Sequence, residues 1–265
     1  MTESVKDIIK SYQGLLGLWR SPNCDLVAVG EILESLKLKL AHIKFLPLAN
    51  TLSSKQELLL ARDIFEIGAI WSIETKNIAG FENYVSLLKY YYFDLKHKLP
   101  TNIGNKYELL GLNLLRLLAE GKLSEFHMEL ELLTPEEKRS IYINHPISME
   151  QYLMGGWYNK VFQSRTDIPS PRFSFFMDTL LHTTRKEIAS CIESGYESLA
   201  RKDLERMLFF SRKEDLLSFA LERKWIFDHN DIYTFPKEVK EKERVLCKMI
   251  AITMLEYAGD LGKIV

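Results

Sequence analysis

Apolar residues recur every three and four positions along the first two-thirds of this chain, and this spacing limits its fold more than any other feature. In the segment after Asp25 the pattern runs through Leu26, Val29, Leu33, Leu36, Leu40 and Ile43. Residues at this spacing share one face of an α-helix. The first two-thirds of the chain is therefore predicted to be a series of amphipathic helices.

Helix-breaking residues divide this pattern into short segments. Pro47 ends the first segment, because helical geometry is disfavoured for the residue before a proline. Further breaks fall at Gly80, Pro100, Gly104 and Gly121. Each predicted helix is short enough to form half of a helical hairpin.

Small residues lie on several of the predicted helix faces, where they would allow neighbouring helices to approach closely. They are Ala61, Gly68, Gly111 and Ala119. Such faces are typical of stacked helical hairpins, and a short solenoid of hairpins is predicted for residues 1–171. An irregular helical bundle is the alternative, because no strict sequence period is found.

The segment Asp167–Pro171 is the clearest boundary in the chain. After it we expect a long helix to about Ile192, a β-prone stretch near Tyr196–Leu199, two short helices, and two β-prone runs joined by a polar turn. This order is that of a winged helix. The predicted fold is therefore all-α with a small β hairpin: a helical-repeat (TPR-like) domain over 1–171, a winged helix over 172–235, and a linker with a C-terminal helix over 236–265.

The second run of the predicted hairpin is short, β-prone and followed by Pro236. An exposed sheet edge offers unpaired backbone groups to a neighbouring chain. We predict a winged-helix edge at a subunit interface, formed by Ile232, Tyr233, Thr234 and Phe235. Closure of the domain's own small sheet is the alternative.

The last predicted helix is apolar at 11 of the 14 positions from Val245 to Ala258. A helix that lies on its own domain needs only one apolar stripe, whereas this one is apolar nearly all round. It is too short and too interrupted to cross a bilayer. We predict that other chains bury it, at a second interface formed by Leu246, Met249, Ile250, Ile252, Met254, Leu255 and Tyr257. The alternative is that it folds back into a groove of its own repeats.

The residue types that carry catalysis do not come together in the sequence. The closest pair of histidines, His127 and His145, is 18 residues apart, and there is no H-x-H, H-E-x-x-H, Walker A or G-x-G-x-x-G motif. No catalytic residue, metal site or cofactor is predicted. Cys191 is interpreted as a buried structural thiol, and the run Tyr90–Phe93 as core packing instead of a ligand pocket.

Charge argues against nucleic acid and membrane partners. The formal net charge is −1, and residues 172–235 carry ten Lys and Arg against eleven Asp and Glu. A winged helix that binds DNA needs a basic recognition helix, since phosphate contacts supply most of the affinity. Three widely spaced cysteines suit a reducing compartment, and no uncharged run exceeds ten residues. A cytosolic or nuclear protein is expected.

Several long strings of residues carry a family resemblance. They are Leu60–Trp71, Tyr90–Asp94, Leu109–Leu115, Glu125–Leu130, His145–Leu153, Tyr158–Phe162, Glu187–Ile192 and Met207–Phe210. In length and order they make the chain resemble the 26S proteasome non-ATPase regulatory subunit 8 family, the small PCI-domain subunits of the regulatory-particle lid. The resemblance extends from about Val5 to Val265. Pro236–Arg244 and Gly155–Trp157 depart from the family pattern.

The resemblance implies a PCI module, in which helical repeats lead into a winged helix, and a non-catalytic scaffold role. Subunits of this family pair through their winged-helix sheets and gather their C-terminal helices into one bundle. The implied partners are other PCI subunits of the lid and the regulatory-particle base, without an obligate homo-oligomer, in the cytoplasm and nucleus. Two alternatives remain: the equivalent subunit of the signalosome or of a translation initiation factor, and a nucleic-acid-binding winged-helix protein.

Overall fold

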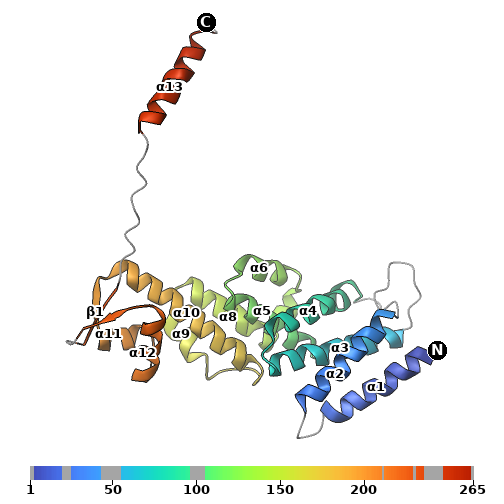
Figure 1. The fold of residues 1–265 in the computed structure, drawn as a ribbon. Coiled ribbons are helices and arrows are strands. Elements are labelled where there is room, and N and C mark those ends of the chain that lie inside the picture. Colours follow the sequence, from blue (N-terminus) through green and yellow to red (C-terminus); the bar gives the residue numbers. More distant parts are fainter. Residues whose placement is uncertain are drawn as a thin grey trace. The chain divides into compact units, whose positions relative to one another are not determined.

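The computed structural model describes residues 3–19, 25–42, 55–95, 105–210, 212–228, 231–235 and 247–263. These residues form α-helices, one π-helix and a three-stranded antiparallel sheet (Figure 1). The predicted class, all-α with a small β element, is confirmed. The chain divides into two compact units, Met1–Glu187 and Ile188–Val265.

The boundary between the two units falls inside one long helix, α10 (Phe173–Gly195). The predicted division into 1–171, 172–235 and 236–265 instead places this whole helix in the winged-helix domain. That division into functional modules stays a prediction. The two compact units divide differently, because the first two-thirds of α10 belongs to the unit that contains the helical array.

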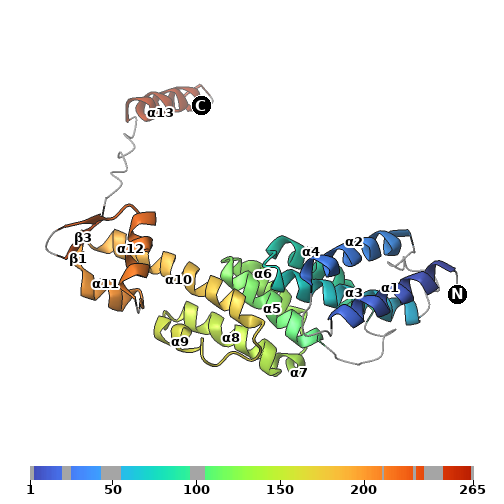
Figure 2. The ribbon, with the colours of Figure 1, turned by 60° about the horizontal axis from the view of Figure 1, so that its bottom comes forward.

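The first unit is an array of packed helices. Its elements are α1 (Glu3–Trp19), α2 (Leu26–His42), α3 (Lys55–Glu74), α4 (Ile78–Lys89), the π-helix η1 (Tyr90–Asp94), α5 (Lys106–Ala119), α6 (Leu123–Glu131), α7 (Pro135–Lys138), α8 (Ile141–Met154), α9 (Tyr158–Gln163) and the start of α10. Helices pack in successive pairs, α1 with α2, α3 with α4 and α5 with α8 (Figure 2). This arrangement agrees with the predicted helical repeats.

Local sequence signals explain where these helices begin and end. The Asn77 side chain caps α4 by accepting a hydrogen bond of 2.9 Å from the backbone N–H of Gly80. Thr134 and Glu137 form a reciprocal capping box at α7. Gly121, with φ of +74°, reverses the chain after α5 in a conformation that glycine adopts without steric cost.

α5 lies at the centre of the array. Its eleven consecutive residues from Leu109 to Ala119 are all buried. The buried Arg116 is paired, because its Nη1 donates to both carboxylate oxygens of Glu120 at 2.9 Å. A helix that is apolar on nearly every side is stable when neighbours cover it on every side, and α5 meets that condition.

Gly111 allows the close approach of α5 to α8. A Cβ atom at this position would lie 2.3 Å from the carbonyl oxygen of Tyr142. We expect Gly111→Ala to lower the free energy of unfolding by about 1–3 kcal/mol, because a backbone atom must move to admit the methyl group. Urea denaturation measures this loss.

Gly14→Ala is the matched control for this substitution. Gly14 lies inside α1, and nothing lies within 4 Å of an added Cβ. The change should raise the free energy of unfolding by about 0.5–1 kcal/mol, because alanine loses less backbone entropy than glycine in a helix. Equal effects of the two substitutions would argue against a tight α5–α8 crossing.

The tyrosine run after α4 packs into the core, as predicted for its central members. Tyr91 and Tyr92 are both buried in η1. The hydroxyl of Tyr92 donates a hydrogen bond of 2.8 Å to the carboxylate of Glu66 on α3. Burial raises the pKa of Glu66 above its ordinary value, while the Tyr92 hydroxyl and the Arg62 guanidinium oppose this rise.

Candidate subunit-interaction surfaces

The second unit contains a winged helix with its own core. After α10 it comprises β1 (Ser198–Ala200), α11 (Arg201–Met207), α12 (Lys213–Glu222), β2 (Ile226–Phe227) and β3 (Ile232–Thr234). This is the predicted element order. Its buried residues are Ala189, Ile192, Leu204, Leu208, Leu216, Phe219, Ala220, Trp225, Tyr233 and Phe235.

The sheet order is β1–β3–β2, so β3 is the central strand. Leu199 of β1 and Phe227 of β2 lie on either side of Tyr233. The prediction that Ile232–Phe235 forms a sheet edge is therefore corrected, because partners within the chain flank β3 on both sides. Whether these residues contact another subunit is a separate matter, and that part stays a prediction.

The side chains of this segment face mainly inward. Tyr233 is 1% exposed and Phe235 is 4% exposed. Both pack on Trp225, with ring centroids 6.2 Å and 5.1 Å away. Ile232 is half-buried and Thr234 is exposed. Two of the four predicted interface side chains are thus part of the winged-helix core.

The apolar side chains exposed in the sheet belong to β2, which is an edge strand. Ile226 is 61% exposed and Phe227 is 46% exposed. Neither residue is among the site residues predicted from the sequence. One signal could have found Ile226: successive side chains of a strand point to opposite faces, so Ile226 faces away from the core that Trp225 enters.

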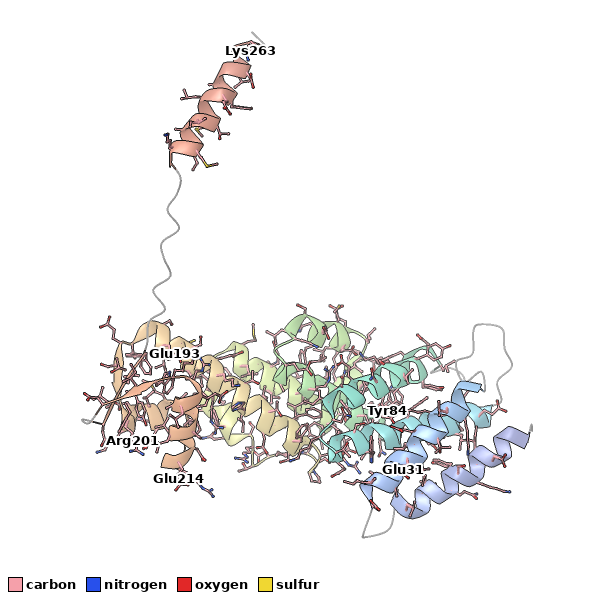
Figure 3. All side chains as sticks on the ribbon, viewed as in Figure 1. Glu31, Tyr84, Glu193, Arg201, Glu214 and Lys263 are labelled. Carbon is pink, nitrogen blue, oxygen red and sulfur yellow. The ribbon has the colours of Figure 1, made fainter. Side chains whose placement is uncertain are left out.

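Glu193 of α10, labelled in Figure 3, holds the turn that leads into β2. Its carboxylate accepts hydrogen bonds from Trp225 Nε1 at 2.7 Å and from Arg223 Nη1 at 3.2 Å. Lys224, between them, adopts a φ of +58°. These contacts anchor the start of β2 to α10, so its exposed residues have a fixed position in the winged helix.

The described outer face of α12 exposes leucines and carboxylates, and the basic Arg212 and Lys224 are exposed just beyond its two ends. Leu217 is 41% exposed and Leu221, one turn later, is 78% exposed. The carboxylates of Glu214 (labelled in Figure 3), Asp215 and Glu222 are exposed beside them. In a winged helix that binds DNA this helix would meet phosphates, which these carboxylates would repel. The surface suits a protein partner better than a nucleic acid.

α13 (Cys247–Leu261) carries most of the second predicted interface. Every side chain from Lys248 to Lys263 is exposed. The exposed large apolar side chains are Met249 (63%), Ile250 (50%), Ile252 (46%), Met254 (70%), Leu255 (73%), Tyr257 (69%) and Leu261 (49%). Leu246, also predicted for this interface, lies outside the described residues. α13 is thus as apolar all round as the buried α5, yet none of the described residues covers it.

The structure also places Cys191 and His127. Cys191 is exposed, so its assignment as a buried thiol was wrong: Ala189 and Ile192 form the buried stripe of α10 there, and Cys191 points away from it. His127 is half-exposed, with Nε2 3.6 Å from Glu150.

Within the described ranges, no three His, Cys, Asp or Glu side chains are grouped as metal ligands would be. None of the helices described has the length and apolar character that crossing a bilayer requires.

Helical pairs that lead into a winged helix, with apolar surfaces left open, define a scaffold protein of the PCI type. Residues 104–244 match the model of the CSN8/PSMD8/EIF3K family. The chain is 36% identical to the 26S proteasome non-ATPase regulatory subunit 8 of Caenorhabditis elegans, over 96% of this chain and 99% of that protein. It is 34% identical to homolog A of that subunit in Arabidopsis thaliana, over 91% and 92% of the two chains. It is also 35% identical to the regulatory subunit RPN12 of Saccharomyces cerevisiae, over 83% and 82%. The chain belongs to the CSN8/PSMD8/EIF3K family, and within it to the 26S proteasome non-ATPase regulatory subunit 8 family.

Proposed function

We propose that this chain is a non-catalytic structural subunit of the proteasome regulatory-particle lid. In this role it supports particle assembly and so the ATP-dependent degradation of ubiquitinated proteins. The observation that carries the proposal is the 36% identity to a proteasome regulatory subunit over 96% of this chain and 99% of the relative. A match of that extent includes both the helical array and the winged helix, so it is more than one shared domain.

The two alternatives are less well supported. The family model is common to signalosome, proteasome and initiation-factor subunits, but the relatives that match over most of the chain are named as proteasome subunits. A nucleic-acid-binding role would need a basic α12, whose outer face instead exposes leucines and carboxylates.

Affinity purification of the tagged full-length chain from its own cells tests the proposed function. We expect the proteasome ATPases and the other lid subunits at amounts near one per tagged chain, in both cytoplasmic and nuclear extracts. An untagged culture is the control. Recovery of signalosome or initiation-factor subunits in their place would overturn the proposal.

We propose α13 as the main assembly element, with Leu246 and the exposed apolar residues of the helix as its contacts. The support is its apolar character on every side together with the full exposure of its described side chains. If partner helices cover roughly 400 Å² of apolar surface, about 10 kcal/mol of gross burial free energy is available before ordering costs. A bundle of C-terminal helices from several subunits would supply such cover.

The open edge of β2 is proposed as a second contact, in place of the β3 edge. An edge strand can accept a neighbour's strand through backbone hydrogen bonds, and Ile226 and Phe227 would add apolar contact. We expect Ile226→Glu to weaken binding to the adjacent lid subunit about tenfold or more, by placing a charge in the interface. Binding is measured with purified subunits, and thermal melting should change little, since Ile226 is not among the buried residues of the winged-helix core.

Ser198→Glu is the matched control, because Ser198 is exposed on β1, the opposite edge of the same sheet. It should leave the binding constant unchanged. If Ile226→Glu and Ser198→Glu weaken binding equally, the proposal that the neighbouring subunit binds specifically at the β2 edge is wrong.

A further inference from the structure

We propose that, in the free chain, α13 packs on the winged helix of its own subunit and leaves it when the lid assembles. The receiving surface, called here the α12–β2 surface, consists of Leu217, Leu221 and Ile226. The inference rests on the proposed function in one respect: it takes α13 to be the helix that the assembled lid covers.

An uncovered α13 is not expected to be a stable helix in water. It has only 15 residues, and isolated helices of that length are marginal in water. Seven of its large apolar side chains are between 46% and 73% exposed, and so large an apolar area promotes aggregation when no partner covers it. Before assembly the helix must therefore either unfold or find a surface.

The linker makes the chain's own winged helix the favoured surface over a second copy. Only the eleven residues 236–246 separate β3 and Phe235 from the start of α13. Eleven residues span at most about 40 Å, so α13 is confined close to its own winged helix at an effective concentration of about millimolar. A second copy would have to compete from the much lower concentration of free subunits.

The α12–β2 surface offers exposed apolar side chains at a spacing on which a helix can pack. Leu217 and Leu221 lie four residues apart and form a ridge of the kind that enters the groove of another helix. The hydrogen bond of 3.0 Å from Trp225 N to Ala220 O folds the start of β2 against the last turn of α12. Ile226, 61% exposed, is the next residue after Trp225 and therefore lies near the end of α12.

With this contact, the α12–β2 surface and the partner subunits of the lid would compete for the same helix, α13. While α13 lies on the α12–β2 surface, it is unavailable to wrong partners, and the exposed side chain of Ile226 on the edge strand is shielded. The assembled lid must offer α13 more burial than the α12–β2 surface does. Release of α13 then frees the β2 edge for its neighbour at the same step.

Hydrogen exchange of the full chain, followed by mass spectrometry at low micromolar concentration, tests the inference. We expect the backbone amides of Cys247–Leu261 to exchange at least about tenfold more slowly than in an unstructured peptide of the same sequence. The double variant L217E/L221E should lose this protection, because two carboxylates replace the apolar ridge. The variant V27E/L38E is the control: Val27 and Leu38 are 71% and 68% exposed on α2, and protection of α13 should be unchanged.

Two outcomes would overturn the inference. Unprotected α13 amides in the monomeric wild-type chain would show that the helix is unfolded before assembly. If the α13 amides lose their protection on dilution, and sedimentation detects a dimer, α13 is covered by a second copy of the chain instead of by its own winged helix. Both readouts use the free chain, whereas the proposed function is judged by copurification, so either can fail without the other. The double variant is expected to still join the lid.

Discussion

A chain that ends after Arg244 is expected to remain folded and to lose its place in the regulatory-particle lid. No described side chain of α13 belongs to the winged-helix core, so its removal should shift the melting temperature by only a few degrees. Binding to the lid should fall at least about 100-fold, since the loss of only about 3 kcal/mol produces that effect. Thermal melting and reconstitution with purified lid subunits measure the two results.

Point variants of α13 test whether incorporation into the lid depends on its apolar side chains or only on the presence of the helix. Leu255→Glu places a charge on a side chain that is 73% exposed and should weaken incorporation strongly. Glu256→Ala, the next residue, changes a charged position of the same helix and should have little effect. A truncated chain that aggregates, or that loses its cooperative melt, would instead show that α13 is part of this subunit's own core.

Tyr233→Pro is expected to unfold the winged helix outright. Tyr233 is 1% exposed in the central strand, between Leu199 and Phe227. Proline supplies no N–H to the sheet and is found essentially only on edge strands or at bulges. Loss of the buried ring costs about 3–5 kcal/mol in addition. Circular dichroism with limited proteolysis should show unit 2 digested while the helical array keeps its own transition.

Tyr233→Phe is the control for that variant. The Tyr233 hydroxyl is buried and has no hydrogen-bond partner among the described residues, so its removal should be neutral within about 1 kcal/mol or stabilising. The original edge interpretation would be restored if Tyr233→Pro melted like the wild type and lost only its binding to the neighbouring lid subunit.

The helices and the element order of the winged helix could be predicted from the sequence, because both depend on local signals. Apolar spacing placed the helix that ends near His42, and glycine placed the turn at Gly121. The strand order could not be predicted in this way. The turn after Phe227 predicts the β2–β3 pair, but the pairing of Ser198–Ala200 with β3 crosses two helices and depends on how α11 and α12 pack.

The different burial of α5 and α13 shows a second limit of prediction from sequence patterns. Both helices are apolar on nearly all sides, and the pattern alone predicts complete burial for each. The helical array covers Leu109–Ala119 within the same chain, whereas the described residues of this chain leave α13 uncovered. The difference lies in the neighbours of each helix, which hydrophobic periodicity does not specify.

The π-helix η1 has a consequence for how relatives of this chain should align. A π-turn is closed by a hydrogen bond five residues back, as between Leu95 N and Tyr90 O at 3.2 Å, and so holds one residue more than an α-turn. Removing one residue from Tyr90–Asp94 would restore α-helical bonding and turn the preceding side chains by about 100° relative to those that follow. Homologues with an uninterrupted α-helix there should therefore show a one-residue gap, and they should lack the tyrosine that reaches Glu66.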